Sequence, residues 1–366
     1  MVKKLKVVIV MGGRSAEHEV SLISAWNIWN GLDKKKYDIK FIGIDRGGEW
    51  RFGKDRDFWV SPGDIKNTKI NPKSPKITAV SKNGKTYLID LKDGKNIFQV
   101  DVFFPITHGT FGEDGCLQGF FEMLGTAYVG PGVLGSAVGM DKDVMKRLLN
   151  EAGIPNAEGY VLKGGRINST DIDEIVADLG LPLFVKPANL GSSVGVSKAH
   201  NKKELGAAIR KAFEYDRKII VEKAIVGREI ECAVIGNEKP IVSTPGEIKL
   251  NSEFYSYEAK YVSETDAAQV PEAELTQKQR RQIQETAMYA YDALGCEGMA
   301  RIDLFLTEKE ELYVNEINTL PGFTNISMFP KMFEESGVGY SELLDELIDF
   351  AIERKLRQDK LKRDFL

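Results

Sequence analysis

The first 130 residues alternate apolar runs with helical patterns, and this alternation restricts the fold more than any other feature of the chain. Leu5–Met11 is a β-branched apolar run closed by Gly12-Gly13, and apolar residues at helical spacing follow over Ser21–Gly31. The alternation continues with two strand patterns and one helical pattern, at Tyr37–Ile44, Val100–Pro105 and Leu117–Leu124. Strands joined by helices pair in parallel, so we expect an open, mostly parallel α/β domain over residues 1–130.

Two further domains are expected, because 366 residues exceed what one hydrophobic core usually organises. Strand patterns on both sides of a loop at Asn189–Ser193, with helical patterns around them, define a smaller second domain over 131–222. The third domain, 223–366, contains a polar stretch without a sustained period at 243–271, which is either a mobile lid or ordinary disorder. A charged amphipathic helix is expected over Tyr340–Leu366.

Charge and cysteine content exclude several classes of function. The chain has 50 Lys and Arg residues against 54 Asp and Glu, so it has no general basic field for nucleic acid or an anionic membrane. Three widely spaced cysteines, Cys116, Cys232 and Cys296, favour a reducing compartment over a disulfide framework. The apolar run Val7–Met11 is too short for a signal peptide or a membrane span, so we expect a cytoplasmic protein.

Three short motifs suggest other structures or functions. Gly130–Gly135 matches the dinucleotide fingerprint, but the strand before it is short and no acidic residue follows at the expected distance. Gly191–Gly195 matches a hydrolase nucleophile elbow, but a strand pattern follows it instead of a helix, and only His200 lies downstream. Both enzyme classes are therefore disfavoured. Asn83-Gly84 predicts a hairpin turn within 46–99, a region to which we assign no function.

A hairpin near the C-terminus brings two carboxylates together. If Ala300–Leu306 pairs antiparallel with Glu311–Asn318, Asp303 faces Glu316 and Arg301 faces Asn318. Opposed carboxylates repel each other unless a positive charge lies between them. Carboxylate and carboxamide oxygens suit Mg²⁺, which binds phosphate oxygens as further ligands. The alternative is a solvated acidic face on which Arg301 forms a local salt bridge, and this feature alone does not decide between the two.

Other residues favour a nucleotide as the ligand of this hairpin. Lys186 lies in an apolar strand before a loop rich in Gly and Ser, and Lys142 follows another glycine turn. Backbone N–H groups of such loops bind phosphate oxygens, and a lysine adds charge. Glu222 and Glu229 lie on either side of the boundary between the second and third domains, where they could bind a base and a ribose. Glycine turns with Glu17 and His108 follow two strands of the first domain, at the edge where open α/β sheets bind ligands.

Together these residues resemble the D-alanine–D-alanine ligase family of the ATP-grasp superfamily over nearly the whole chain. The resemblance is carried by seven segments, namely GGRSAEHEVSLIS (12–24), HGTFGEDG (108–115), GMDK (139–142), VKPANLGSSVGV (185–196), YSYEAKY (255–261), ARIDLFL (300–306) and NEINTLPGFTNISMFP (315–330).

The resemblance implies a three-domain ATP-grasp fold that binds ATP between the central and C-terminal domains. It implies two Mg²⁺ ions, with Mn²⁺ as an alternative, held by Asp303, Glu316 and Asn318. The residues that it implies for ATP are Lys142, Lys186, Ser192, Glu222, Lys223, Ile225, Glu229 and Lys260. Those that it implies for the substrates and the chemistry are Glu17, His108, Ser192, Tyr261, Arg301, Gly322, Ser327 and Met328.

The implied activity joins two D-alanines through a D-alanyl phosphate, for peptidoglycan precursor synthesis by a homodimer. Glu17 would receive the first D-alanine and form a hydrogen-bonded triad with Ser192 and Tyr261. Arg301 and the Gly322 N–H would stabilise the oxyanion, while Ser327 and Met328 would hold the second substrate. Tyr261 favours D-alanine over D-lactate as that substrate. The alternatives are another carboxylate–amine ligase of the superfamily, or a non-catalytic nucleotide-binding regulator that would not need Glu17, Tyr261 and Arg301 together.

Overall fold

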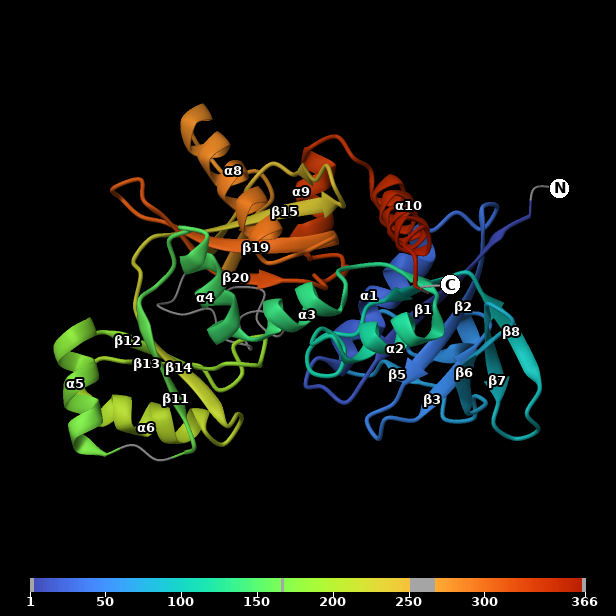
Figure 1. Ribbon diagram of the computed structural model, residues 1–366, viewed down its shortest axis with the longest axis horizontal. Helices are drawn as coiled ribbons and strands as arrows, with labels where there is room; N and C mark the ends of the chain where they lie inside the picture. The colour runs from blue at the N-terminus through green and yellow to red at the C-terminus, as the bar shows by residue number, and fades with distance from the viewer. Residues whose placement is uncertain (1–2, 166–167, 251–266, 364–366) are drawn as a thin grey trace.

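A computed structural model describes residues 3–165, 168–250 and 267–363, and a five-stranded sheet forms the core of its N-terminal domain (Figure 1). The strand order is β10-β9-β1-β2-β3, in which the first four strands are parallel and β3 is antiparallel. This confirms the predicted open, mostly parallel sheet. The elements are β1 (Leu5–Gly12), α1 (His18–Gly31), β2 (Tyr37–Ile44), β3 (Trp50–Gly53), β9 (Val102–Pro105), α2 (Cys116–Leu124) and β10 (Ala127–Tyr128).

The irregular region 46–99 adds a second layer to this domain. Strands β6, β7 and β8 form an antiparallel sheet whose buried residues pack with those of α2. Asn83 and Gly84 connect β6 and β7 with φ angles of 53° and 69°, which confirms the predicted hairpin turn. The elements of this region are η1 (Arg56–Phe58), β4 (Trp59–Val60), β5 (Lys69–Ile70), β6 (Ile77–Lys82), β7 (Lys85–Asp90) and β8 (Asn96–Val100).

The central region contains a four-stranded antiparallel sheet in the order β11-β14-β12-β13, which packs against α5 and α6. Residues 188–196, which we call the Gly-Ser loop, join β12 to β13. Strands therefore lie on both sides of this loop, as predicted, and it is not a nucleophile elbow. The elements are α3 (Val133–Met140), α4 (Lys142–Glu151), β11 (Gly159–Lys163), α5 (Ser169–Leu179), β12 (Leu183–Pro187), β13 (Ser197–Ala199), α6 (Lys202–Ala212) and β14 (Lys218–Lys223).

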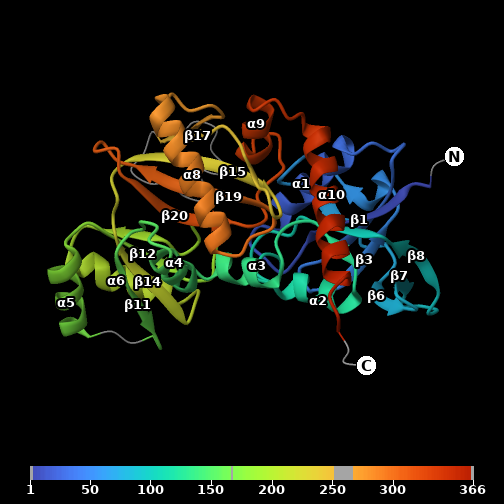
Figure 2. The same cartoon turned by 45° about the horizontal axis from the view of Figure 1, so that its top comes forward.

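The C-terminal sheet is antiparallel, in the order β18-β17-β15-β19-β20 with β16 beside β15. One apolar cluster packs this sheet against α8, α3 and α4, and another joins α9 and α10 to β1 and α1. Figure 2 shows α10 beside α1. The elements are β15 (Arg228–Gly236), β16 (Ile241–Val242), β17 (Gly246–Leu250), β18 (Ala267–Val270), α8 (Gln277–Ala293), β19 (Gly298–Leu306), β20 (Leu312–Asn318), α9 (Met328–Glu335) and α10 (Tyr340–Asp359).

Two of the predicted boundaries are wrong. The polar stretch 243–271 is not irregular at its ends, because β17 pairs with β15 and with β18. There the buried Glu247 accepts two hydrogen bonds from Arg228, at 2.8 Å each, which explains how a polar sequence forms a strand. Its middle, with Lys260 and Tyr261, lies outside the described residues. The last helix ends at Asp359 instead of Leu366, because no residue from 355 to 363, where the described chain ends, is buried against the core.

Candidate active site

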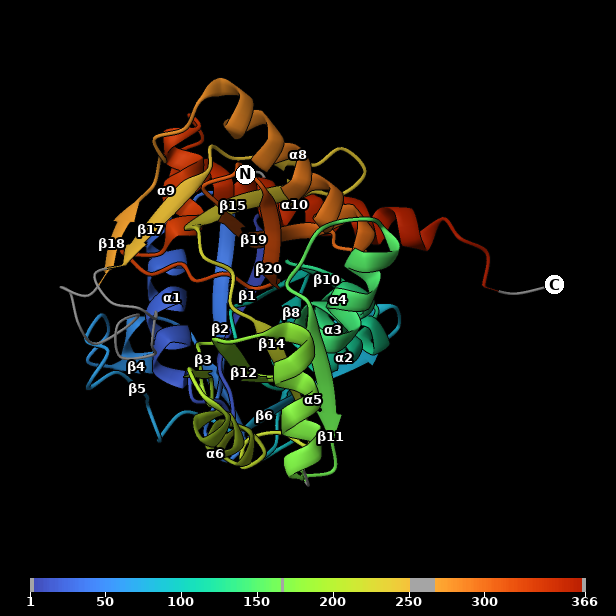
Figure 3. The same ribbon diagram turned by 90° about the vertical axis from the view of Figure 1, so that its left-hand side faces the viewer.

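The two antiparallel sheets and the N-terminal domain enclose one pocket. Figure 3 shows β12 and β14 of the central sheet below β15, β19 and β20 of the C-terminal sheet. Every predicted site residue that the structure describes lines this pocket, namely Glu17, His108, Lys142, Lys186, Ser192, Glu222, Lys223, Ile225, Glu229, Arg301, Asp303, Glu316, Asn318, Gly322, Ser327 and Met328. Residues far apart in the sequence are therefore brought together as expected.

The hairpin of β19 and β20 has the predicted register at its functional end. Asp303 faces Glu316 and Arg301 faces Asn318. The same alternation buries Ile302 in the core behind the sheet. We expected the same register along the whole hairpin, and beyond Asp303 this is wrong. Leu304 pairs with Val314, so that a β-bulge leaves Asn315 without a paired residue on β19. The bulge directs Asn315 into the pocket, where its Oδ1 accepts a hydrogen bond from Lys186 Nζ at 3.0 Å.

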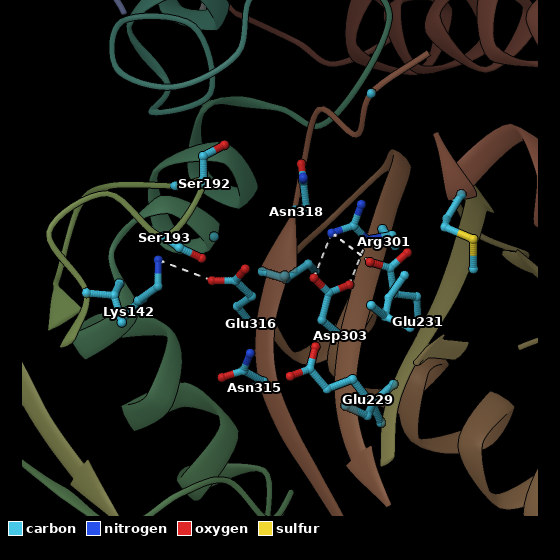
Figure 4. Close-up of a pocket in the computed structure, with 18 of the residues that line it drawn as sticks. Lys142, Ser192, Ser193, Glu229, Glu231, Arg301, Asp303, Asn315, Glu316 and Asn318 are labelled. Carbon is cyan, nitrogen blue, oxygen red and sulfur yellow. Dashed lines mark hydrogen bonds and ion pairs between the residues drawn. The ribbon is translucent and has the colours of Figure 1, made fainter. Parts of the chain in front are cut away.

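Cations neutralise the opposed carboxylates, as Figure 4 shows. Arg301 donates two hydrogen bonds of 2.7 Å to Asp303 and lies 3.3 Å from Glu231 of β15. Lys142 Nζ lies 3.3 Å from Glu316. The local salt bridge that we considered as an alternative is therefore present, but it lies on a buried face and not on a solvated one, because Arg301 and Asp303 side chains are each 16% exposed. Burial opposes the Arg301 charge, but the carboxylates raise its pKa well above the usual range.

A second cluster of buried charges links the central sheet to α4. Glu222 of β14 accepts hydrogen bonds from Lys186 and from Lys146, the latter at 2.9 Å. Burial opposes ionisation, but the two ammonium groups outweigh it and lower the pKa of Glu222 to about 2. Burial lowers the pKa of Lys146, whereas Glu222 raises that of Lys186 despite its burial. Lys146 was not predicted, although its spacing of four residues from Lys142 places both on one face of α4.

Glu17 connects the N-terminal domain to the Gly-Ser loop. It lies between β1 and α1 and accepts a hydrogen bond from the Ser192 hydroxyl, which joins two of the three predicted triad residues. The third, Tyr261, lies outside the described residues. Ser192 and its neighbour Ser193 have φ angles of 51° and 58°, so the loop holds two non-glycine residues in the left-handed region. Such strain is typical of functional loops.

His108 and residues of the loop 319–327 form another part of the pocket wall. His108 Nδ1 is 3.0 Å from the carbonyl oxygen of Leu320 and 3.6 Å from Glu113. Burial opposes protonation of His108, but Glu113 raises its pKa above the ordinary value. Within the loop, the Thr324 N–H donates to Ser327 Oγ at 2.9 Å. Gly322 is required there, because a Cβ at this position would lie 2.7 Å from Ser327 Oγ.

Comparisons with known proteins agree with this arrangement. Residues 6–131 match the family model "D-ala D-ala ligase N-terminus", and residues 148–349 match "D-ala D-ala ligase C-terminus". A D-alanine–D-alanine ligase of Oceanobacillus iheyensis is 51% identical over 360 residues, which cover 98% of each chain.

Solved structures with the same architecture include a D-alanine–D-alanine ligase from Coxiella burnetii and the VanG D-Ala:D-Ser ligase from Enterococcus faecalis. The first has a TM-score of 0.84 and 38% identity and covers 98% of both chains. The second has a TM-score of 0.80 and 38% identity and covers 95% of this chain and all of its own. The predicted ATP-grasp fold is thereby confirmed, and the chain belongs to the D-alanine–D-alanine ligase family.

Proposed function

We propose that this protein ligates two D-alanine molecules to D-alanyl-D-alanine with the hydrolysis of ATP to ADP and phosphate, for cell-wall precursor synthesis. The observation that carries the proposal is the convergence of charged groups from three parts of the chain. Glu17 comes from the β1–α1 connection of the N-terminal domain, Lys186 and the Gly-Ser loop come from the central sheet region, and Arg301 and the carboxylates come from the C-terminal hairpin. The formation of a phosphorylated carboxylate and the attack of an amine on it need all three sets of groups in one place.

In the first step, the carboxylate of one D-alanine attacks the γ-phosphorus of ATP. ADP is the leaving group, and D-alanyl phosphate forms. Glu17 would accept the ammonium group of this D-alanine, while Ser192 holds the Glu17 carboxylate in place. Lys142 and Lys186 would bind the phosphates from the side of the central sheet, with Lys260 of the segment outside the described residues as a further cation. Most of the acceleration would come from positioning and charge neutralisation.

Magnesium fits the donor set of the C-terminal hairpin. Asn318 Oδ1 is buried and has no hydrogen-bond partner, and it lies beside two opposed carboxylates. Within the described parts of the chain, no three His, Cys, Asp or Glu side chains gather to hold a metal. Asp303, Glu316 and Asn318 would therefore hold Mg²⁺ only together with phosphate oxygens. We propose two Mg²⁺ ions at this place, with Mn²⁺ as an alternative. The ion would supply positive charge to the transferred phosphoryl group.

In the second step, the amine of another D-alanine attacks the acyl carbon of D-alanyl phosphate, and phosphate leaves. Arg301 and the Gly322 N–H would stabilise the tetrahedral oxyanion. Ser327 and Met328 would bind the carboxylate of the attacking D-alanine, with His108 beside it. At the other end of the pocket, Lys223 and Ile225 would contact adenine, Glu229 would bind the ribose, and Glu222 would orient Lys186.

The second substrate is the part of the proposal that most needs a direct test, because the E. faecalis neighbour is a D-Ala:D-Ser ligase. We would measure ADP formation with D-alanine present and absent, and then with D-serine, D-lactate and L-alanine as second substrates. ADP formation that requires D-alanine, with the dipeptide identified by mass spectrometry, would support the proposal. Nucleotide binding without turnover would favour a regulator, and turnover with another amino acid alone would favour a different ligase.

We further propose that the domains 1–130, 131–222 and 223–366 close over this pocket in a cytoplasmic homodimer, with the part of 243–271 between β17 and β18 as a lid. No helix in the described parts of the chain is long and apolar enough to cross a membrane. All three cysteines are free, as a reducing compartment would require. Light scattering after size-exclusion chromatography tests the dimer, and a monomeric active enzyme would refute it.

A further inference from the structure

Helix α1 contacts both proposed substrate subsites, although none of its residues was considered as part of the site. The helix begins at His18, directly after Glu17, which would receive the first D-alanine. Two turns further along, Ser24 and Asn27 contact the loop 319–327, which carries the groups proposed for the second D-alanine. A rigid helix thus joins two subsites that belong to different domains.

The contacts of α1 with this loop are made to the backbone of one residue. The Phe323 N–H donates a hydrogen bond to Ser24 Oγ at 3.2 Å, and Asn27 Nδ2 donates to the Phe323 carbonyl oxygen at 3.0 Å. Ser24 is fully buried. These bonds fix the two peptide planes that follow Gly322, whose own lack of a side chain leaves it conformationally free. Asn27 holds the carbonyl of the same peptide whose N–H, from Thr324, donates to Ser327 Oγ.

Ser24 also contacts His108, which anchors the other side of Gly322. His108 Nε2 is 3.3 Å from Ser24 Oγ, and His108 Nδ1 is 3.0 Å from the Leu320 carbonyl oxygen. A carbonyl only accepts, so Nδ1 carries a proton; Nε2 accepts a hydrogen bond from the Ser24 hydroxyl when the ring is neutral and donates one to Ser24 Oγ when the ring is protonated. The resulting chain runs from the Phe323 N–H through Ser24 and His108 to Leu320. This chain of hydrogen bonds therefore holds the loop at Leu320 and at Phe323, on either side of Gly322.

We propose that Ser24, supported by Asn27, is a positioning residue for the second-substrate subsite. It holds the Gly322–Phe323 peptide so that the Gly322 N–H and Ser327 stay aligned with the second D-alanine. This inference rests on the proposed function, because it assigns a role within the same ligation. Removal of Ser24 Oγ leaves the buried Phe323 N–H without an acceptor, and the loop then moves to find one.

The test compares Ser24→Ala with Ser21→Ala in steady-state assays of ADP formation over a range of D-alanine concentrations. Ser21 is a matched control, because it is also fully buried on α1 and forms two hydrogen bonds, but to Gly12 and Ile106 within the N-terminal domain. We expect Ser24→Ala to raise the KM of the second D-alanine by about fivefold or more, as the loss of one buried hydrogen bond implies, with a lower kcat. The KM of the first D-alanine and the Kd of ATP should stay within about twofold.

Asn27→Ala provides an independent test if Ser24→Ala fails to fold, since Asn27 is only partly buried. It should raise the second KM in the same direction and leave the first unchanged. The inference is overturned if the KM of the second D-alanine stays unchanged in a folded Ser24→Ala or Asn27→Ala variant, or if the KM values of both D-alanines rise equally. It is also overturned if Ser21→Ala raises the KM of the second D-alanine alone. A wild-type protein that forms no ADP with D-alanine would instead refute the proposed function.

Discussion

Replacement of Glu222 by Gln tests whether the buried charge cluster stabilises the central domain. The two lysines lower the pKa of Glu222 from its ordinary value of 4.5 to about 2. A difference of one pH unit corresponds to about 1.4 kcal/mol, so the ionised carboxylate contributes about 3 kcal/mol to the free energy of unfolding at pH 7. The Gln side chain keeps a carbonyl acceptor but no charge, and we expect Glu222→Gln to lose about this amount.

The assay must report on the central domain. All four tryptophans lie in the first 59 residues, so their fluorescence would follow the wrong domain. Hydrogen exchange with mass spectrometry reads β12 and β14 directly, and a loss of about 3 kcal/mol predicts exchange about 100-fold faster in these strands. The exposed Glu214 lies in the same region, and Glu214→Gln is the control that should exchange as the wild type does.

The pH dependence gives a second, independent measure of the same interaction. Because the pKa of Glu222 is lower in the folded protein, its contribution is complete above about pH 4.5 and is lost as the pH falls toward 2. The difference in free energy of unfolding between wild type and Glu222→Gln, measured from the hydrogen exchange of β12 and β14 at each pH, should therefore fall to about half by pH 3. Equal stability of the two proteins at pH 7, or a difference that does not change with pH, would refute the reasoning.

Three further predictions concern other parts of the chain. Calorimetry should detect Mg²⁺ binding only with a non-hydrolysable ATP analogue present, because Asp303 and Glu316 already pair with Arg301 and Lys142 and the ion needs phosphate oxygens as further ligands. Tight binding without nucleotide would contradict this. Ellman's reagent at pH 8 should modify only the exposed Cys116 in the native protein and all three cysteines in urea, because burial raises the pKa of Cys232 and Cys296 to about 12. Arg354→Met should lower the free energy of unfolding by about 3 kcal/mol, since the buried guanidinium donates to the carbonyl oxygens of Tyr128 and Gly130. Arg281→Met, at an exposed position, is the control and should have little effect. Equal losses of stability in the two variants would refute the role of the Arg354 hydrogen bonds.

Much of the site could be predicted from the sequence, because strand periodicity determines which side chains share a face. The two-residue period placed Arg301 and Asp303 on the pocket side of β19, and the hairpin register then paired them with Asn318 and Glu316. The same period fails at Asn315, where the bulge occurs. The side chain of Asn315 there accepts a hydrogen bond from Lys186, 129 residues away in the chain, and local patterns contain no information on such a contact.

The partners of the charged residues were harder to predict than their positions. We considered Glu222 only as a ligand for a base or ribose, whereas in the structure it holds Lys186 and Lys146. Glu231 faces Asp303 across β15 and β19, but its proximity to Arg301 depends on the order of strands that are distant in sequence. Lys146 was missed, although its helical spacing from Lys142 could have indicated it, while the pairing of β15 with β19 was not accessible from the sequence.

These ion pairs explain how several charged side chains can lie together in the buried wall of the pocket. Lys186 and Lys142 are almost buried, and a buried ammonium group without a counter-charge is costly. Glu222 and Glu316 supply that counter-charge, and each holds its lysine in the pocket wall. A bound triphosphate would bring its own negative charge to the same lysines. Glu316 would then be released from Lys142 to face a metal ion, so the proposed reaction would exchange the same contacts that hold these lysines in the pocket wall.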